Sequence, residues 1–217
     1  MPRRRSLLGS RLPTSWNWGV PGEREDVYKR QPPAMKDISL HVMDILQNSI
    51  AAKARLMEIC VLADTSANRL TVSIRDDGKG MDAELVRRVT SPFTTSRTTR
   101  KVGLGIPLFQ AGAEQTGGSF SIQSQVGKGT LVKAVYVMDS IDRPPRGDIA
   151  GVVYTAIICN PELDFIYRVG KDGREFIADT RELKAVLNGI PLDDIEVGPW
   201  LAEYLKQGEN DVIGGVL

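Results

Sequence analysis

The sequence predicts an α/β fold, because helical and strand-like segments alternate along the chain. The hydrophobic pattern is helical over 36–54, and a second helix is expected over 106–116. Leu70, Val72 and Ile74 alternate with polar residues, the period of two that turns one side of a strand toward a core. A chain of 217 residues is long enough for one core plus an appendage.

The turn at 75–81, with the sequence RDDGKGM, directly follows this strand. The strand delivers Asp76 to the end of a sheet, where its carboxylate can accept a hydrogen bond from an exocyclic amine such as that of adenine. Gly78 and Gly80 lack a Cβ, so the backbone can turn sharply and a flat ligand can lie against it. Asp-Gly dipeptides are also ordinary turn formers, so a simple hairpin is the alternative for this segment alone.

The helix predicted upstream, 36–54, carries a polar face. Asp44 and Asn48 are four residues apart and therefore share that face. The side-chain oxygen of Asn48 suits Mg²⁺, a hard cation that takes few protein oxygens and keeps several waters. Asp44 can act as a general base through one water. For an isolated pair of this kind the alternative is a solvated helix face.

A polar segment at 91–106 leads into the helix predicted over 106–116. Its basic side chains could pair with phosphate oxygens, and its threonines offer hydroxyl groups. Its glycines allow the backbone to approach the phosphates just before a helix N-terminus, which favours anions. The candidate residues are Thr94, Thr95, Arg97, Arg100, Lys101, Gly103, Leu104, Gly105 and Ile106. A tight turn at 125–130 then leads through Thr130 into the strand 131–138. The alternatives are a solvated loop for the first segment and an ordinary strand residue for Thr130.

In this order the four segments resemble the N box, G1 box, lid with G2 box, and G3 box of the GHKL superfamily. Its nucleotide-binding (Bergerat) fold is shared by gyrase, the large ATP-driven heat-shock chaperone, histidine kinases and MutL. The resemblance covers roughly 36–138. It implies a two-layer sandwich of helices on a mixed, mostly antiparallel sheet, with ATP and Mg²⁺ as cofactors. It also implies that Asp76 binds adenine, that Thr130 shares a water with Asp76, and that Met81 belongs to the nucleotide site.

Asp44 occupies the position at which many members of the superfamily carry the glutamate that activates water. The aspartate is one methylene shorter, and Gln47 stands where a neighbouring acid is often seen, which argues against efficient hydrolysis. The lid and the segment 141–148 resemble, more closely, a family of small stand-alone bacterial ATP-binding proteins. That closer resemblance brings no established substrate.

Three parts are expected along the chain. Residues 1–34 are interpreted as a disordered or artefactual extension, because 26–31 resembles the translation of a sequencing adapter. Residues 35–139 are the expected ATP-binding domain, and 140–217 the expected small C-terminal α/β appendage.

The C-terminal appendage is expected to contain a buried helix at 149–159, a hairpin around 170–173, and helices near 181–187 and 197–207. Trp200 and Tyr204, at helical spacing, are expected in the core. No catalytic constellation is visible, so this part is interpreted as a surface for partner docking or dimerisation.

The composition argues against nucleic acid and membranes as partners. Lys+Arg number 28 and Asp+Glu 27, so a net charge of +1 creates no general attraction to polyanions. The longest apolar run is far shorter than the ~20 residues that a membrane helix needs. Cys60 and Cys159 lie in apolar surroundings without metal-ligand spacing, so we expect reduced core cysteines in a cytoplasmic protein.

The favoured hypothesis is a signalling protein kinase that phosphorylates a histidine or a serine/threonine of a separate partner protein. His41, the only histidine, lies seven residues before Asn48 on the nucleotide-site helix, so it cannot easily reach its own γ-phosphate. The alternative is a slow ATPase whose lid closure or dimerisation drives a change in a partner complex. A third class is a non-catalytic nucleotide sensor, and a homodimer is compatible with each.

Overall fold

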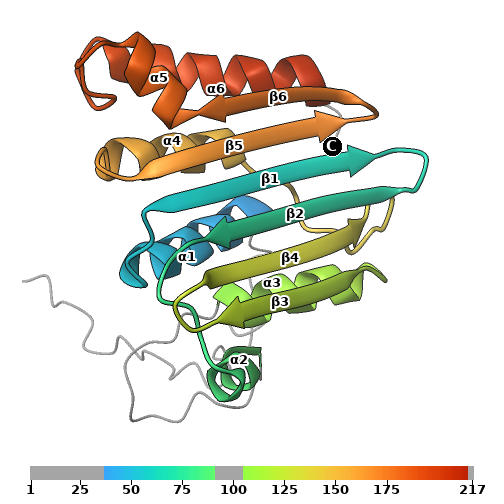
Figure 1. Cartoon of the computed structure of the whole chain (residues 1–217). Helices are drawn as coiled ribbons and strands as arrows, with labels where there is room; N and C mark the ends of the chain where they lie inside the picture. The colour runs from blue at the N-terminus through green and yellow to red at the C-terminus, as the bar shows by residue number, and fades with distance from the viewer. Residues whose placement is uncertain (1–36, 91–104, 215–217) are drawn as a thin grey trace, which may run out of the picture. The chain divides into compact units, whose positions relative to one another are not determined.

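A computed structural model describes residues 37–90 and 105–214, which belong to one compact unit, Met35–Leu217. The elements of this part are α1 (Ile38–Ala51), β1 (Leu56–Asp64), β2 (Arg69–Asp76), α2 (Ala83–Thr90), α3 (Gly105–Gln115), β3 (Ser119–Gln125), β4 (Gly129–Val137), α4 (Ile149–Cys159), β5 (Asp164–Lys171), β6 (Arg174–Asp179), α5 (Thr180–Val186) and α6 (Val197–Ile213). The strands form one six-stranded sheet with the order β3-β4-β2-β1-β5-β6 (Figure 1). The predicted α/β fold is confirmed.

The sheet is mixed and mostly antiparallel, as predicted. β1 pairs with β2, β2 with β4, β3 with β4, and β5 with β6, all antiparallel. β1 and β5 are parallel. A parallel pair cannot be joined by a tight turn, so the chain passes through α4 before β5 joins β1.

One face of the sheet packs against helices. Along β1 and β2 every second side chain is buried, as the alternation of a half-buried strand requires. In Figure 1, α1, α3 and α4 lie behind the sheet, and α6 contacts β5 and β6. The largest fully buried side chains of this core include Phe109, Tyr136, Phe165, Tyr167, Met57 and Leu46. The result is a two-layer arrangement, helices on sheet.

The start of α1 follows from a local signal. Asp37 is its N-cap, and the side chain accepts a hydrogen bond from the backbone N–H of Leu40 at 3.0 Å. The predicted helix 36–54 is therefore shorter than expected at both ends. The edge strand β3 was not expected, because its sequence SFSIQSQ holds two apolar residues and none of its side chains is fully buried.

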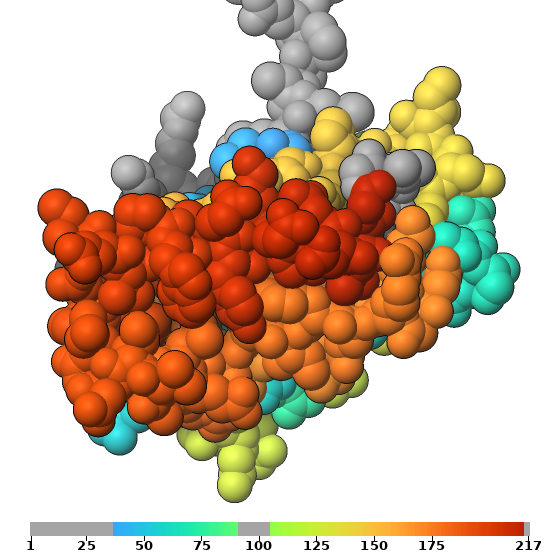
Figure 2. All heavy atoms as spheres, turned by 90° about the horizontal axis from the view of Figure 1, so that it is seen from above, coloured from blue at the N-terminus to red at the C-terminus, as the bar shows by residue number. Residues whose placement is uncertain are grey.

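The C-terminal part contains the expected helix, hairpin and two helices, and Figure 2 looks onto the face formed by α5 and α6. β5 pairs with β1 along its whole length, so the sheet continues across the boundary predicted at 139–140. The appendage therefore extends the sheet of the domain expected over 35–139, and α4 packs against α1 as well as α6. Pairing between strands about a hundred residues apart carries no local sequence signal.

Two expectations about the core are wrong. Cys159 is exposed because it is the last residue of α4, and Cys60 is half-buried; both thiols are free. Trp200 is 48% exposed, whereas Tyr204, on which it stacks with ring centroids 5.2 Å apart, is partly buried and packs against the core as expected. Helical spacing places these two rings on one face of α6 without deciding which face is inward. The buried face carries Leu201 and Leu205 instead.

Among residues 37–90 and 105–214, none of the helices combines the length and apolar character needed to cross a membrane.

Candidate functional site

Asp76 ends β2 with a buried carboxylate, 8% exposed, that points toward α1. Its Oδ2 accepts a hydrogen bond from the Ser49 hydroxyl at 2.8 Å, and its Oδ1 accepts one from the backbone N–H of Gly78 at 2.9 Å. Both donors are neutral, and an ionised carboxylate has about four acceptor positions. The side chain is therefore held in place while acceptor capacity remains for a ligand.

The turn after Asp76 lies directly on the end of α1. The backbone N–H of Lys79 donates to the carbonyl of Ala52 at 2.9 Å. A Cβ on Gly78 would lie 2.9 Å from the same carbonyl oxygen, closer than real contacts allow. Glycine at 78 thus lets the turn pack against the end of α1, and the interpretation that a flat ligand lies against this backbone stays a prediction.

Gly80 and Gly129 let two turns interlock. Gly80 has φ +64°, and a Cβ there would lie 2.0 Å from the carbonyl oxygen of Gln125. Gly129 has φ +90°, and a Cβ there would lie 1.9 Å from the carbonyl oxygen of Asp76. The backbone N–H of Gly127 donates to the carbonyl of Lys79 at 2.8 Å. The β3–β4 turn is thus fastened to the Asp76 turn.

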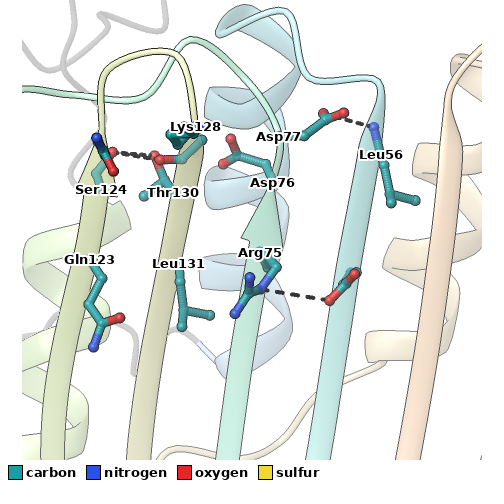
Figure 3. Close-up of a pocket in the computed structure, with 12 residues that line it drawn as sticks. Leu56, Arg75, Asp76, Asp77, Gln123, Ser124, Lys128, Thr130 and Leu131 are labelled. Carbon is teal, nitrogen blue, oxygen red and sulfur yellow. Dashed lines mark hydrogen bonds and ion pairs between the residues drawn. The ribbon is translucent and has the colours of Figure 1, made fainter.

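Thr130 stands beside Asp76, because the two are directly paired positions of β4 and β2. Figure 3 shows both at the ends of adjacent strands, with the hydroxyl of Thr130 2.9 Å from that of Ser124. The Ser124 oxygen also accepts a hydrogen bond from the backbone N–H of Met81 at 2.8 Å. Asp76, Gly80 and Met81 from one predicted segment, and Thr130 from another, therefore belong to one assembly.

Asp44 and Asn48 lie on α1, Asp44 half-buried and Asn48 exposed. A Cβ on Gly105, the first residue of α3, would lie 2.5 Å from the Cβ of Asp44 and 3.0 Å from its Oδ2. Ile106 follows as a buried residue. The structure thus brings the predicted water-activating carboxylate against the helix N-terminus at which phosphate was expected.

The remaining predicted residues lie outside the residues that the structure describes. They are Thr94, Thr95, Arg97, Arg100, Lys101, Gly103 and Leu104.

Three residues of the assembly were not predicted. Asp77 accepts hydrogen bonds from the backbone N–H groups of Arg55 and Leu56 at 2.7 and 3.0 Å, which ties the turn to the start of β1 (Figure 3). Ser49 orients Asp76, and Ser124 joins the two turns. The sequence shows only that Ser49 is a polar residue next to Asn48 in a largely apolar helix. Serine is too common at such positions for this pattern to indicate a site residue.

A groove of about 500 Å³ reaches the Asp76 turn from the other side of the sheet (Figure 3). Glu58, Arg75 and Gln123 line it, and the Arg75 guanidinium lies 3.8 Å from Glu58. The Asp76 carboxylate is turned away from these residues, toward Ser49 on the helix side. Asp76 and Thr130 also line the groove at the strand ends, so it borders the turn, and the hydrogen bond to Ser49 directs the Asp76 carboxylate to the helix side, where the nucleotide is expected.

His41 is buried on α1, 4% exposed, with its ring centroid 6.0 Å from that of Phe109. Within the described part of the chain, no group of three or more His, Cys, Asp or Glu residues could hold a metal ion. Asn48 is exposed and one turn from Asp44, so its amide oxygen is accessible to a cation that takes most of its ligands from phosphates and water.

Residues 36–139 match the family described as Histidine kinase-, DNA gyrase B-, and HSP90-like ATPase. Among curated proteins, a Shewanella frigidimarina protein described as a sensor protein is 32% identical over 103 residues, 46% of this chain and 16% of that protein. Sporulation kinase C of Bacillus subtilis is 26% identical over 98 residues, 45% of this chain and 23% of the kinase. Sensor histidine kinase ZraS of Escherichia coli is 27% identical over 106 residues, 49% of this chain and 23% of the kinase. The chain thus spans less than a quarter of the length of these relatives.

Two solved structures are similar at 15% identity. One is the N-terminal domain of a DNA repair protein, with a TM-score of 0.45 and coverage of 65% of this chain and 51% of that chain. The other is the ATPase domain of Aquifex aeolicus MutL complexed with ADP, with a TM-score of 0.41 and coverage of 69% and 68%. The match over 36–139 contains every described residue of the site, from Asp44 to Thr130. Residues 36–139 therefore belong to the Histidine kinase-, DNA gyrase B-, and HSP90-like ATPase family, the GHKL superfamily.

Proposed function

We propose that this chain binds Mg·ATP with adenine against Asp76 and acts as a protein kinase on a separate protein. The observation that carries the nucleotide assignment is the buried Asp76 carboxylate, held by Ser49 and Gly78 with acceptor capacity to spare. The exocyclic amine of adenine donates the hydrogen bond that such a carboxylate lacks. Thr130, paired with Asp76 across the two strands, is suited to sharing a water with it.

The phosphates are assigned to the start of α3. Backbone N–H groups at the first turn of a helix are unpaired and attract anions. Gly105 lets this turn approach Asp44, and Asn48 lies one helical turn further along α1. Asn48 would contribute one oxygen ligand to Mg²⁺. When bound, this ion would neutralise part of the negative charge of the phosphates. Asp44 orients water or the acceptor group.

Transfer to a separate protein is favoured over self-phosphorylation of a histidine. His41 is a buried residue of the site helix α1 itself, packed near Phe109, so it would have to leave the core to receive a phosphoryl group. Two of the relatives are named kinases, and their names give the chemistry proposed here. In the proposed reaction the bond between the γ-phosphorus and its bridging oxygen breaks, and a bond from the γ-phosphorus to the partner's side chain forms. The side chain's proton passes through a water to Asp44, and ADP leaves.

The partner is proposed to dock on the outer side of α5, α6 and the turn between them. Ile195 is 88% exposed, Ile190 51% and Trp200 48%, so three large apolar side chains are accessible around this turn. Asp193 and Asp194 flank them in sequence. A segment with apolar and basic residues, from a partner protein or a second copy of this chain, would complement this surface. Ile195→Ser with Trp200→Ser should weaken partner phosphorylation or self-association while Mg·ATP binding stays unchanged.

A slow ATPase is the second candidate, and the position of Asp44 beside Gly105 favours it. The experiment that separates the two measures Mg·ATP binding and phosphate release on the same sample of the purified full-length chain. Release that disappears in Asp44→Ala, with Glu162→Ala as the control that removes an exposed carboxylate away from the site, identifies the ATPase. Binding without release directs the search to γ-phosphate transfer to a partner, and a chain that binds no Mg·ATP refutes both.

A further inference from the structure

We propose that Arg146, Tyr167 and Glu209 position the nucleotide helix α1 from the C-terminal part of the chain. These three residues are called the Glu209 cluster below. The proposal rests on the proposed function, since it assigns to the cluster an effect on Mg·ATP binding. It gives the C-terminal part a direct connection to the site, through the segment 143–147 that joins the two.

The segment 143–147 completes the start of α1. The first N–H groups of a helix have no partner inside it and need one from elsewhere. The backbone N–H of Ile38 donates to the carbonyl of Pro145 at 2.9 Å, and that of Ser39 donates to the carbonyl of Arg146 at 3.0 Å. The first turn of α1 is therefore hydrogen bonded to the very residue whose side chain enters the cluster.

This contact is close as well as directional. Gly147 has φ +70°, and a Cβ there would lie 2.5 Å from both the Asp37 carboxyl carbon and the Ser39 hydroxyl. At the other end of the segment, Arg143 Nε donates to the carbonyl of Met138 at 2.8 Å. The segment is thus held between the end of β4 and the beginning of α1.

The Glu209 cluster fastens this segment to α6 and β5. The Arg146 guanidinium forms an ion pair with one carboxylate oxygen of Glu209, and the Tyr167 hydroxyl donates to the other. The side chains of Arg146 and Glu209 are only 18% and 5% exposed. Burial raises the pKa of Tyr167 and lowers that of Arg146. A buried charge without its partner is strongly destabilising, so the pair holds its members in one arrangement.

Movement at the start of α1 reaches the site because a helix is stiff. Ser39 and Ser49 are ten residues apart on α1, about 15 Å along the axis. Ser49, which orients Asp76, and Asp44, which faces Gly105 of α3, both belong to α1. A displacement of about 1 Å in catalytic or binding groups is enough to lower activity by a large factor. Loosening the segment 143–147 should therefore weaken Mg·ATP binding without removing any group that touches the nucleotide.

The test compares Glu209→Gln with the control Glu175→Gln, which removes a carboxylate from the exposed ion pair with Arg168 at 3.2 Å. We expect Glu209→Gln to raise the Kd for Mg·ATP about tenfold or more, and the control to leave it unchanged. Amide hydrogen exchange in the nucleotide-free full chain is the second readout. Exchange at Ile38 and Ser39 should accelerate in Glu209→Gln and not in the control.

A second variant separates positioning from stability. The triple substitution Arg146→Met, Tyr167→Phe and Glu209→Met replaces the cluster by apolar side chains, a change that is often neutral or stabilising for a buried ion pair. We expect thermal stability near that of wild type, with faster exchange at Ile38 and Ser39 and weaker Mg·ATP binding. Unchanged exchange in a folded Glu209→Gln or triple variant overturns the proposal. Exchange does not depend on ATP, so failure of wild type to bind Mg·ATP refutes the proposed function separately.

Discussion

Two buried carboxylates in this molecule are held in different ways. Asp76 is 8% exposed and accepts hydrogen bonds from the hydroxyl of Ser49 and the backbone of Gly78. Glu209 is 4% exposed and meets the Arg146 guanidinium and the Tyr167 hydroxyl. Within residues 37–90 and 105–214, Asp76 makes no ion pair.

The difference separates a candidate ligand site from a structural cluster. At Glu209 a cation balances the charge and both oxygens have partners, so nothing further is needed. At Asp76 both donors are neutral. The carboxylate lies at the end of β2, beside the two interlocked turns, and can accept further hydrogen bonds. A buried acid held as Asp76 is held can contribute binding energy to a ligand that brings a further hydrogen-bond donor.

The two sites also differ in how they are assembled. The Asp76 site depends on backbone approaches at Gly78, Gly80 and Gly129, where a Cβ would meet main-chain oxygen atoms. The Glu209 cluster depends on long side chains that reach across from three separate elements. Substitutions at these glycines should therefore disturb the main chain of the Asp76 site, whereas substitutions in the Glu209 cluster act through side-chain contacts alone.

The largest expected effect is that of Asp76→Asn on Mg·ATP binding. The amide would place an N–H₂ group against the adenine amine, so we expect a loss of at least about 100-fold in affinity, close to 3 kcal/mol. Titration calorimetry measures this loss, and circular dichroism checks the fold. Asp77→Asn is the matched control, because its Oδ1 can still accept from Arg55 and Leu56. Wild-type affinity in Asp76→Asn would remove the basis of the nucleotide assignment.

Gly80→Ala tests the backbone assembly of the site. A Cβ would lie 2.0 Å from the carbonyl oxygen of Gln125 at a φ of +64°, so both strain and a clash with the main chain result. We expect a loss of about 2–3 kcal/mol in the free energy of unfolding, measured by urea denaturation. Gly127→Ala is the control: its φ is +75° but its Cβ would meet nothing within 4 Å, so about 1 kcal/mol is expected. Equal losses in the two variants would contradict the interlocked turns.

Ser49→Ala removes one of the two neutral donors that hold Asp76. The carboxylate would keep its bond from Gly78 but lose its fixed orientation toward α1. We expect Mg·ATP affinity to fall about fivefold to tenfold, equivalent to about 1 kcal/mol, the usual contribution of a hydrogen bond. Thr155→Ala, which removes an exposed hydroxyl that donates to the Gly151 carbonyl on α4, should bind as wild type in the same titration. If Ser49→Ala also binds as wild type, this hydroxyl does not orient the ligand-binding carboxylate.

Tyr167→Phe should have the smallest effect on function. It removes one donor to Glu209 while the Arg146 ion pair remains. We expect a loss of about 1 kcal/mol in the free energy of unfolding. The Kd for Mg·ATP should stay within about twofold of the wild-type value, because the segment 143–147 is still fastened to α6. A larger loss of affinity than in Glu209→Gln would assign the positioning role to the hydroxyl instead of the ion pair.

Much of the site was predictable because its signals are local. Asp76 follows an alternating strand, Gly80 lies in the turn after it, and Asp44 shares a helix face with Asn48. Such patterns depend on spacings of two to four residues, which the sequence displays directly. The order of four such segments then identified the superfamily, and the match over 36–139 agrees with it.

The supporting residues were not predictable, because their roles depend on partners far along the chain. Ser49 meets Asp76 across 27 positions and Ser124 meets Met81 across 43. Tyr167 meets Glu209 across 42, and Arg146 brings a third separate segment to the same point. Serine, tyrosine and glutamate occur at many positions without such roles, so no local feature distinguishes these.

Local periodicity in the sequence was enough to establish the fold class, the order of most helices and strands, and the position of the adenine-binding candidate. Folding in three dimensions placed β5 beside β1, turned Trp200 outward, and joined the start of α1 to α6 through Arg146. The physical reason is that neighbour spacing selects secondary structure and its apolar face. Contacts between distant segments arise only when the whole core packs. That packing decides which polar groups form hydrogen bonds with each other and which remain available to a ligand.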